Sequence, residues 1–102
     1  MNTPVISRQK FDASLTAAAP PTGLPGPLEA LWWEQKGDWT RAHALVNELE
    51  TPDGMAAHAH LHRREGDLSN AEYWYRRAGR DHFRDDLHEE WLALVGALTG
   101  AG

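Results

Sequence analysis

The sequence predicts an all-α fold: a short α-solenoid of two helix-turn-helix units completed by a C-terminal capping helix. Two observations support this prediction. From residue 28 onward, apolar residues recur at the three- and four-residue spacing of amphipathic helices and never alternate, as they would in strands, over a useful length. The pair Gly-Asp occurs at 37–38 and again at 66–67, where glycine ends one helix and aspartate caps the next. Helical hairpins at a fixed offset are typical of solenoids.

The composition excludes several functional classes. The chain has 102 residues, enough for one domain, and contains no cysteine, which excludes disulfides, thiolate metal sites and cysteine nucleophiles. A formal net charge of −5 argues against nucleic acid as a partner. Apolar runs are too short for a membrane helix. We therefore expect a cytoplasmic protein that binds neither nucleic acid nor membranes.

The first part of the chain differs in composition from the rest. We expect residues 1–27 to form an N-terminal arm and residues 28–102 to form the helical domain. Apolar residues at helical spacing predict a short helix over 7–19 that docks on the domain. The segment 20–27 contains four prolines and two glycines, which disfavour a helix or a central strand, so it is predicted to be a linker.

Caps and breakers predict the helices of the first unit. Pro27 suits the first position of a helix because its missing amide would be unpaired there, and Gly37 ends that helix. Asp38 caps the second helix. The inward side of this second helix is apolar and comprises Ala42, Leu45, Val46 and Leu49.

The same signals predict the helices of the second unit. Thr51 followed by Pro52 opens a third helix that ends before Gly66. Asp67 caps a fourth helix, which stops at Gly79. The small and aromatic residues of this fourth helix fall on one side at helical spacing.

A fifth helix is predicted to start near Asp85 or Asp86 and to carry an apolar stripe made of Leu87, Trp91, Leu94, Val95 and Leu98. Acidic residues crowd its first turns: Asp85, Asp86, Glu89 and Glu90. Negative charge is favourable there because of the helix dipole, so we expect these carboxylates to cap the helix and face solvent rather than act as an acid/base pair. With no other catalytic motif in the sequence, we expect no enzyme.

Shifting the chain by 29 residues aligns the two units, with Ala30 on Ala59 and Ala42 on Ala71 beside the paired Gly-Asp turns. Small residues at these positions let two helix backbones approach closely. The segment 66–78 resembles the turn and second helix of a tetratricopeptide repeat, and the run 74–78 is similar to the related Sel1-like repeats. The resemblance extends over residues 28–79 and implies a scaffold or adaptor that binds a protein or an acidic peptide.

In that family the first helix of each unit lines a concave groove. The resemblance places three residues of each unit in it: Leu31, Glu34 and Gln35, then His60, Arg63 and Arg64. Arginine pairs bind carboxylates in a bidentate manner, which favours an acidic ligand for this partly basic groove. Alternatively, the two arginines form a solvated face paired with Glu65 or with the acidic fifth helix.

The tryptophans provide a second candidate contact surface. Helical spacing places Trp32 and Trp74 inward, whereas Trp33 and Trp39 cannot easily share that stripe. We therefore expect Trp33 to be a partner-binding anchor if it is exposed, because aromatic residues dominate interface hot spots. A homodimer formed through the open end of the short array is a further hypothesis.

The most distinctive motif is the run of alternating histidines at 58–62. His58 and His62 share one side of a helix, a spacing that can chelate a transition metal, while His60 points elsewhere. Candidates for a third ligand are His43, Glu65 and the His82/His88 region. We expect both imidazoles to be packed and hydrogen-bonded in the core and the protein to bind neither metal nor cofactor; a metal site at His58 and His62 is the alternative.

Overall fold

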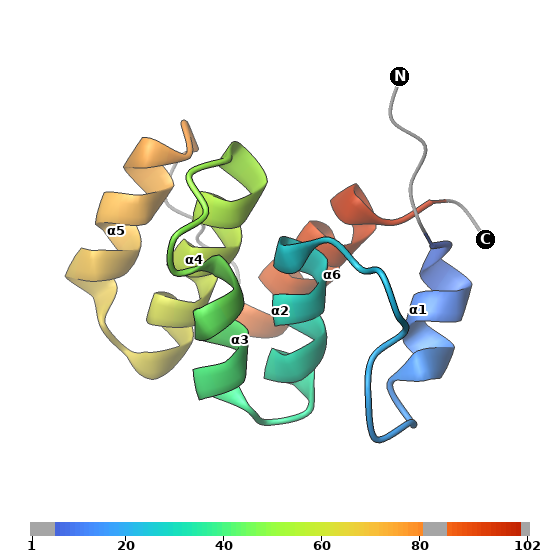
Figure 1. The fold of residues 1–102 in the computed structure, drawn as a ribbon. Coiled ribbons are helices and arrows are strands. Elements are labelled where there is room, and N and C mark those ends of the chain that lie inside the picture. Colours follow the sequence, from blue (N-terminus) through green and yellow to red (C-terminus); the bar gives the residue numbers. More distant parts are fainter. Residues whose placement is uncertain (1–5, 81–85, 101–102) are drawn as a thin grey trace.

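The computed structural model describes residues 6–80 and 86–100, and this part of the chain is all-helical, as predicted. Its six helices are α1 (Arg8–Ser14), α2 (Gly26–Gln35), α3 (Trp39–Val46), α4 (Pro52–Glu65), α5 (Leu68–Arg77) and α6 (Leu87–Leu98) (Figure 1). None of these helices is both long and apolar enough to cross a membrane. Asp86 caps α6, and Asp85 lies outside the described residues.

Helices α2 and α3 form one hairpin, and α4 and α5 form a second hairpin of the same local design. Gly37 and Gly66 end the first helix of each hairpin with the same φ of +90°, a conformation that favours glycine. Asp38 and Asp67 then cap the second helices through their side chains. All four paired alanines are fully buried: Ala30, Ala42, Ala59 and Ala71. Both turns lie at the same end of the molecule, the lower end in Figure 1.

The N-terminal helix is shorter than predicted. Ser7 caps α1, and Phe11 is fully buried in the main core, but the helix ends at Ser14 instead of residue 19. The Ser14 hydroxyl donates to the Phe11 carbonyl at 2.6 Å, and such bonds compete with helix continuation. The same hydroxyl accepts from Trp32 Nε1 at 3.0 Å, which ties the end of α1 to α2.

The predicted linker also ends earlier than expected. Pro25 is the N-cap of α2, so Gly26 and Pro27 belong to the helix rather than to the connection. Proline is tolerated in the first turn because the amides there have no helical partner.

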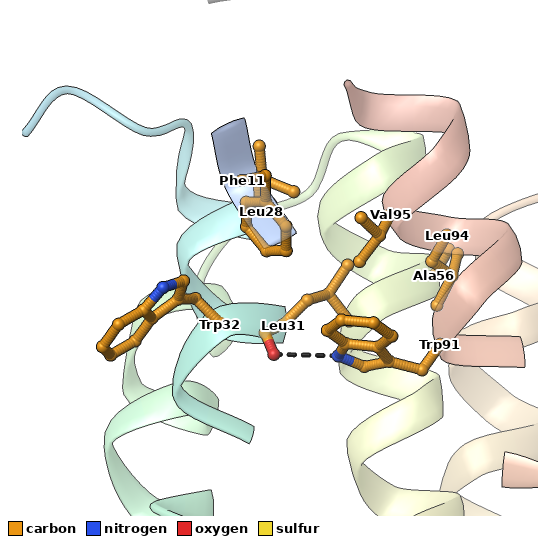
Figure 2. Close-up of a cluster of buried hydrophobic side chains, with 8 residues drawn as sticks. All are labelled: Phe11, Leu28, Leu31, Trp32, Ala56, Trp91, Leu94 and Val95. Carbon is orange, nitrogen blue, oxygen red and sulfur yellow. Dashed lines mark hydrogen bonds between the residues drawn. The ribbon is translucent and has the colours of Figure 1, made fainter. Parts of the chain in front are cut away.

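Helix α6 lies across the first helices of the two hairpins and completes the core. Figure 2 shows the side chains that meet there: Phe11, Leu28, Leu31, Trp32, Ala56, Trp91, Leu94 and Val95. The indole of Trp91 donates to the Leu31 carbonyl at 2.9 Å, which satisfies its only polar atom inside the core. The inner face of α2 and α4 is therefore covered by the chain's own last helix.

Within the described residues, the first and last segments also meet. Ser7 and Gly100 form an isolated β-bridge. The Arg8 amide donates to the Gly100 carbonyl at 2.8 Å, and the Gly100 amide donates to the Ile6 carbonyl at 2.9 Å. This pairing places α1 beside the end of α6.

Candidate functional site

The residues predicted to line a groove are distributed differently from that prediction. Leu31, Glu34 and His60 are buried, because α6 lies on the face that would otherwise be concave and open. Gln35 and Arg64 are exposed, and Arg63 is partly buried. The expectation of an open groove along the first helices is therefore wrong.

Four of these residues do come together, in an ionic cluster with a buried centre that is completed by two residues the prediction did not include. The imidazole of His60 lies between two carboxylates, with Nε2 2.7 Å from Glu34 Oε2 and Nδ1 2.6 Å from Glu90 Oε1. Arg64 donates to Glu34 at 2.7 Å, and Arg63 donates to Glu90 at 3.0 Å. We refer to the following residues as the ionic cluster: Glu34, His60, Arg63, Arg64, Tyr75 and Glu90.

The cluster holds His60 in its charged form. Burial alone would lower the pKa of His60, but its hydrogen bonds to Glu34 and Glu90 and their charges outweigh burial and raise that pKa to about 9. Burial likewise opposes the charged form of Glu90, yet hydrogen bonds from His60, Tyr75 and Arg63 lower its pKa. Burial and the neighbouring Glu90 raise the pKa of Tyr75, whose hydroxyl donates to that carboxylate.

The expectation that Glu90 is a solvated capping residue is wrong. Glu90 is 2% exposed, because it lies between Leu87 and Leu94 on the stripe of α6 that faces the core. The sequence contained a signal for this burial: Glu90 follows Leu87 by three residues and precedes Leu94 by four, and residues at these spacings share a helix face. The alternative prediction for the two arginines is confirmed in part, because Arg63 does pair with the acidic start of the last helix.

Trp33 is not an exposed anchor. It is half-buried between α2 and α3, its indole donates to Glu29 at 3.2 Å, and the guanidinium of Arg41 lies 4.3 Å from its ring centre. In the described part of the chain, the exposed large apolar side chains are Leu68 and Tyr73, both on α5.

The second assembly is formed by His43 on α3 with His58 and His62 on α4, and we refer to these three residues as the histidine triad. One ligand nitrogen from each ring can be chosen so that all three lie within 4.8 Å of one another. His43 Nε2 is 3.0 Å from His58 Nε2. His43 is thus the third residue that the sequence left open. Of the other candidates for the third ligand, Glu65 is adjacent to His62. His88 lies on α6, and His82 lies outside the described residues.

The triad is enclosed by two tryptophans. Trp39 stacks on His43 with ring centres 4.8 Å apart, and Trp74 stacks on His58 with ring centres 4.2 Å apart. His58 and His62 are 2% and 7% exposed, as the packing interpretation predicted. However, the Nδ1 atoms of His58 and His62 are buried without a hydrogen-bond partner, which the packing interpretation does not explain.

The environment of His43 and His58 favours neutral imidazoles. Burial, followed by the proximity of His62 and His43, lowers the pKa of His58 to about 4. Burial and His62 also lower the pKa of His43, although Glu65 acts in the opposite direction. A neutral imidazole has a free lone pair, which is the form that binds a metal ion. His43 and His58 therefore present nitrogen lone pairs at neutral pH.

The donor set of the triad suits a particular class of ion. Imidazole nitrogens favour zinc, copper, nickel and cobalt, whereas calcium and magnesium prefer oxygen ligands. Two nitrogens bound to one tetrahedral zinc ion lie about 3.3 Å apart, close to the separation of the His43 and His58 nitrogens. The third nitrogen, from His62, lies within 4.8 Å of both.

Comparison of the chain with family models, curated proteins and solved structures finds no match.

Proposed function

We propose that the chain is a transition-metal-binding protein whose two hairpins form a short tetratricopeptide-like solenoid. Its role is binding rather than catalysis. The repeated glycine turns, aspartate caps and buried alanines support the solenoid assignment, because they recur with one spacing in both hairpins. The metal-binding assignment depends on one observation: three histidines from two helices converge within 4.8 Å.

This convergence joins the two hairpins. His43 belongs to the first hairpin, and His58 and His62 belong to the second, so an ion bound by all three would crosslink α3 to α4. Binding free energy would then add to the stability of the folded chain, because the unfolded chain does not present a preformed site. An ion at one hundred times its dissociation constant adds about 2.7 kcal/mol.

The first test is calorimetric titration of the chelator-treated full chain with zinc, nickel and copper. We expect one ion per chain with a dissociation constant below about 100 μM. The variant His43→Gln should bind at least about tenfold more weakly, because it removes a ligand. His43 is the best residue to change, since it is only half-buried and its replacement is tolerated more easily than that of His58 or His62.

His88→Gln is the matched control, because His88 is an exposed histidine on α6, outside the triad. It should bind like the wild type. Absence of binding by the wild type, or equal weakening in both variants, would reject the metal site.

A second proposal concerns a protein partner, and it is favoured by the exposed apolar residues of α5. Leu68 is 57% exposed and Tyr73 is 50% exposed, on the helix at the outer end of the array (Figure 1). We propose that this end of the array pairs with a second copy of the chain, since the end unit of a solenoid exposes the surface on which a further unit would pack.

Sedimentation equilibrium tests the pairing. The wild type should dimerise, and Leu68→Asp should shift it to monomer, because a charge at that position would be buried in the interface. Aspartate is favourable in the first turn of a helix, so the fold should be retained. Gln9→Asp makes the same kind of change on α1, at the other end of the molecule, and should leave the dimer intact. A monomeric wild type at high concentration would contradict this proposal.

A further inference from the structure

The position of Glu65 carries a further inference about the histidine triad, and it rests on the proposed metal-binding function. Glu65 follows His62 by three residues and His58 by seven, so all three side chains lie on one side of α4. Its Oε1 is 3.7 Å from His62 Nδ1. Glu65 therefore lies beside His62, the member of the histidine triad nearest the end of α4.

The distance between Glu65 and His62 fits shared coordination better than a direct contact. At 3.7 Å it is too long for a hydrogen bond, and His62 Nδ1 is buried without any hydrogen-bond partner. Nitrogen and oxygen ligands lie about 2.0–2.2 Å from a zinc ion, so two of them in a tetrahedral site are about 3.3–3.5 Å apart. The observed separation is close to this value.

Asp67 is the other carboxylate within reach, since His62, Glu65 and Asp67 also offer ligand atoms within 4.8 Å of one another. However, Asp67 is already engaged as the cap of α5. Its Oδ1 accepts from the Asn70 amide at 3.3 Å, and its Oδ2 accepts from Asn70 Nδ2 at 3.4 Å. Moving this carboxylate onto an ion would remove the cap, which is typically worth about 1 kcal/mol.

Glu65, in contrast, does not cap a helix. Among the described residues it accepts no hydrogen bond, and its side chain is 36% exposed, so it can move without uncovering the core. It is the last residue of α4 and lies next to the Gly66 turn.

We propose that Glu65 is the fourth ligand of a divalent transition-metal ion held by His43, His58 and His62. Four protein ligands close the coordination sphere, which is the arrangement of structural metal sites, whereas catalytic zinc sites keep one position for water. The site would therefore hold its ion between α3 and α4 without activating a water molecule.

Cobalt(II) titration of the chelator-treated full chain tests this assignment, because four-coordinate cobalt absorbs visible light far more strongly than five- or six-coordinate cobalt. The wild type should give the intense four-coordinate spectrum. Glu65→Gln should still bind cobalt, at least about tenfold more weakly, with a weaker and shifted spectrum, because water molecules enter in place of the carboxylate and raise the coordination number. Asp67→Asn is the matched control: asparagine also caps helices, so both spectrum and affinity should match the wild type.

The outcomes separate this inference from the proposed function. If Glu65→Gln keeps both the spectrum and the affinity of the wild type, the histidines bind the ion and Glu65 is not a ligand. If its affinity falls while the spectrum is unchanged, Glu65 orients His62 from outside the coordination sphere, which also overturns the assignment. If Asp67→Asn loses the four-coordinate spectrum, Asp67 is the ligand. A wild type that binds neither cobalt nor zinc rejects both the metal site and the role of Glu65.

Discussion

Replacement of His60 by leucine is expected to lower the free energy of unfolding by about 3–5 kcal/mol. His60 is fully buried and bridges Glu34 and Glu90, which are 4% and 2% exposed. Leucine fills a similar volume but removes the positive charge that separates the two carboxylates. Removing one partner of a buried ionic assembly leaves uncompensated charge in a region of low dielectric constant. Urea unfolding of the wild type and the variant measures the effect.

Repeating His60→Leu in a second variant of the chain shows whether charge or packing causes the loss of stability. When Glu34 and Glu90 are both replaced by glutamine, His60→Leu no longer leaves unpaired carboxylates, so it should destabilise the chain less, with a coupling of at least about 1 kcal/mol. His88→Leu, a change of an exposed histidine, should stay within about 0.5 kcal/mol of the wild type. An equal loss from His60→Leu in both backgrounds would show that packing alone explains the effect.

The stability of the metal-free chain is expected to be greatest near pH 6.5 and to fall on both sides. On the acid side, His58 has a pKa of about 4 in the fold, against about 6.5 when unfolded. The unfolded chain therefore takes up the proton first, and stability is lost as the pH falls from about 6.5 to about 4. The lowered pKa of His43 adds to this loss, and the lowered pKa of Glu90 adds a further loss at still lower pH.

On the alkaline side, stability falls as the pH rises. The pKa of His60 is raised to about 9, so the stabilisation from its charged form is complete below about pH 6.5 and is lost as the pH rises through 9. On each side, one titrating group changes the free energy of unfolding by at most about 1.4 kcal/mol per pH unit.

Urea unfolding in the presence of a chelator, at about pH 5, 6.5 and 8.5, measures both limbs. His58→Gln should flatten the acid limb and keep the alkaline limb, whereas His60→Leu should do the reverse. A stability that is constant from pH 5 to 8.5 would contradict both assignments.

Local signals in the sequence were sufficient to place the helices. Side-chain caps at Ser7, Asp38, Thr51, Asp67 and Asp86 each accept a hydrogen bond from an amide in the first turn of the following helix. The glycines that end α2, α4 and α5 all have positive φ. These features depend on residues a few positions apart, so they can be read without knowing the tertiary fold. Helix α1 was one exception, because hydroxyl groups near Ser14 bond to the backbone and end it early. Helix α3 was another, since it ends at Val46 and Leu49, predicted on its inward side, lies outside the helix.

Contacts between distant segments were harder to predict. Glu34, His60 and Glu90 belong to three helices, and a charged residue on an apolar stripe gives no indication of which partner will neutralise it. The resemblance to a repeat family pointed toward an open groove, whereas α6 fills that face with Trp91 and Glu90. For the histidines, the spacing of His58 and His62 was informative because both lie on one helix. The sequence alone could not select His43 as the third residue, because its position beside His58 and His62 depends on how α3 packs against α4.

The pairing of Ser7 with Gly100 joins the two ends of the described chain on one side of the molecule, while α5 remains at the open side. In an open spiral of repeats, each unit is held only by its neighbours, so the structure can unravel from a free end. Here the outermost helix on one side, α1, is held by both the bridge and the contact of Phe11 with Trp91, whose ring centres are 6.2 Å apart. Detaching α1 would open the core under α6 as well, so we expect these two helices to unfold together rather than separately.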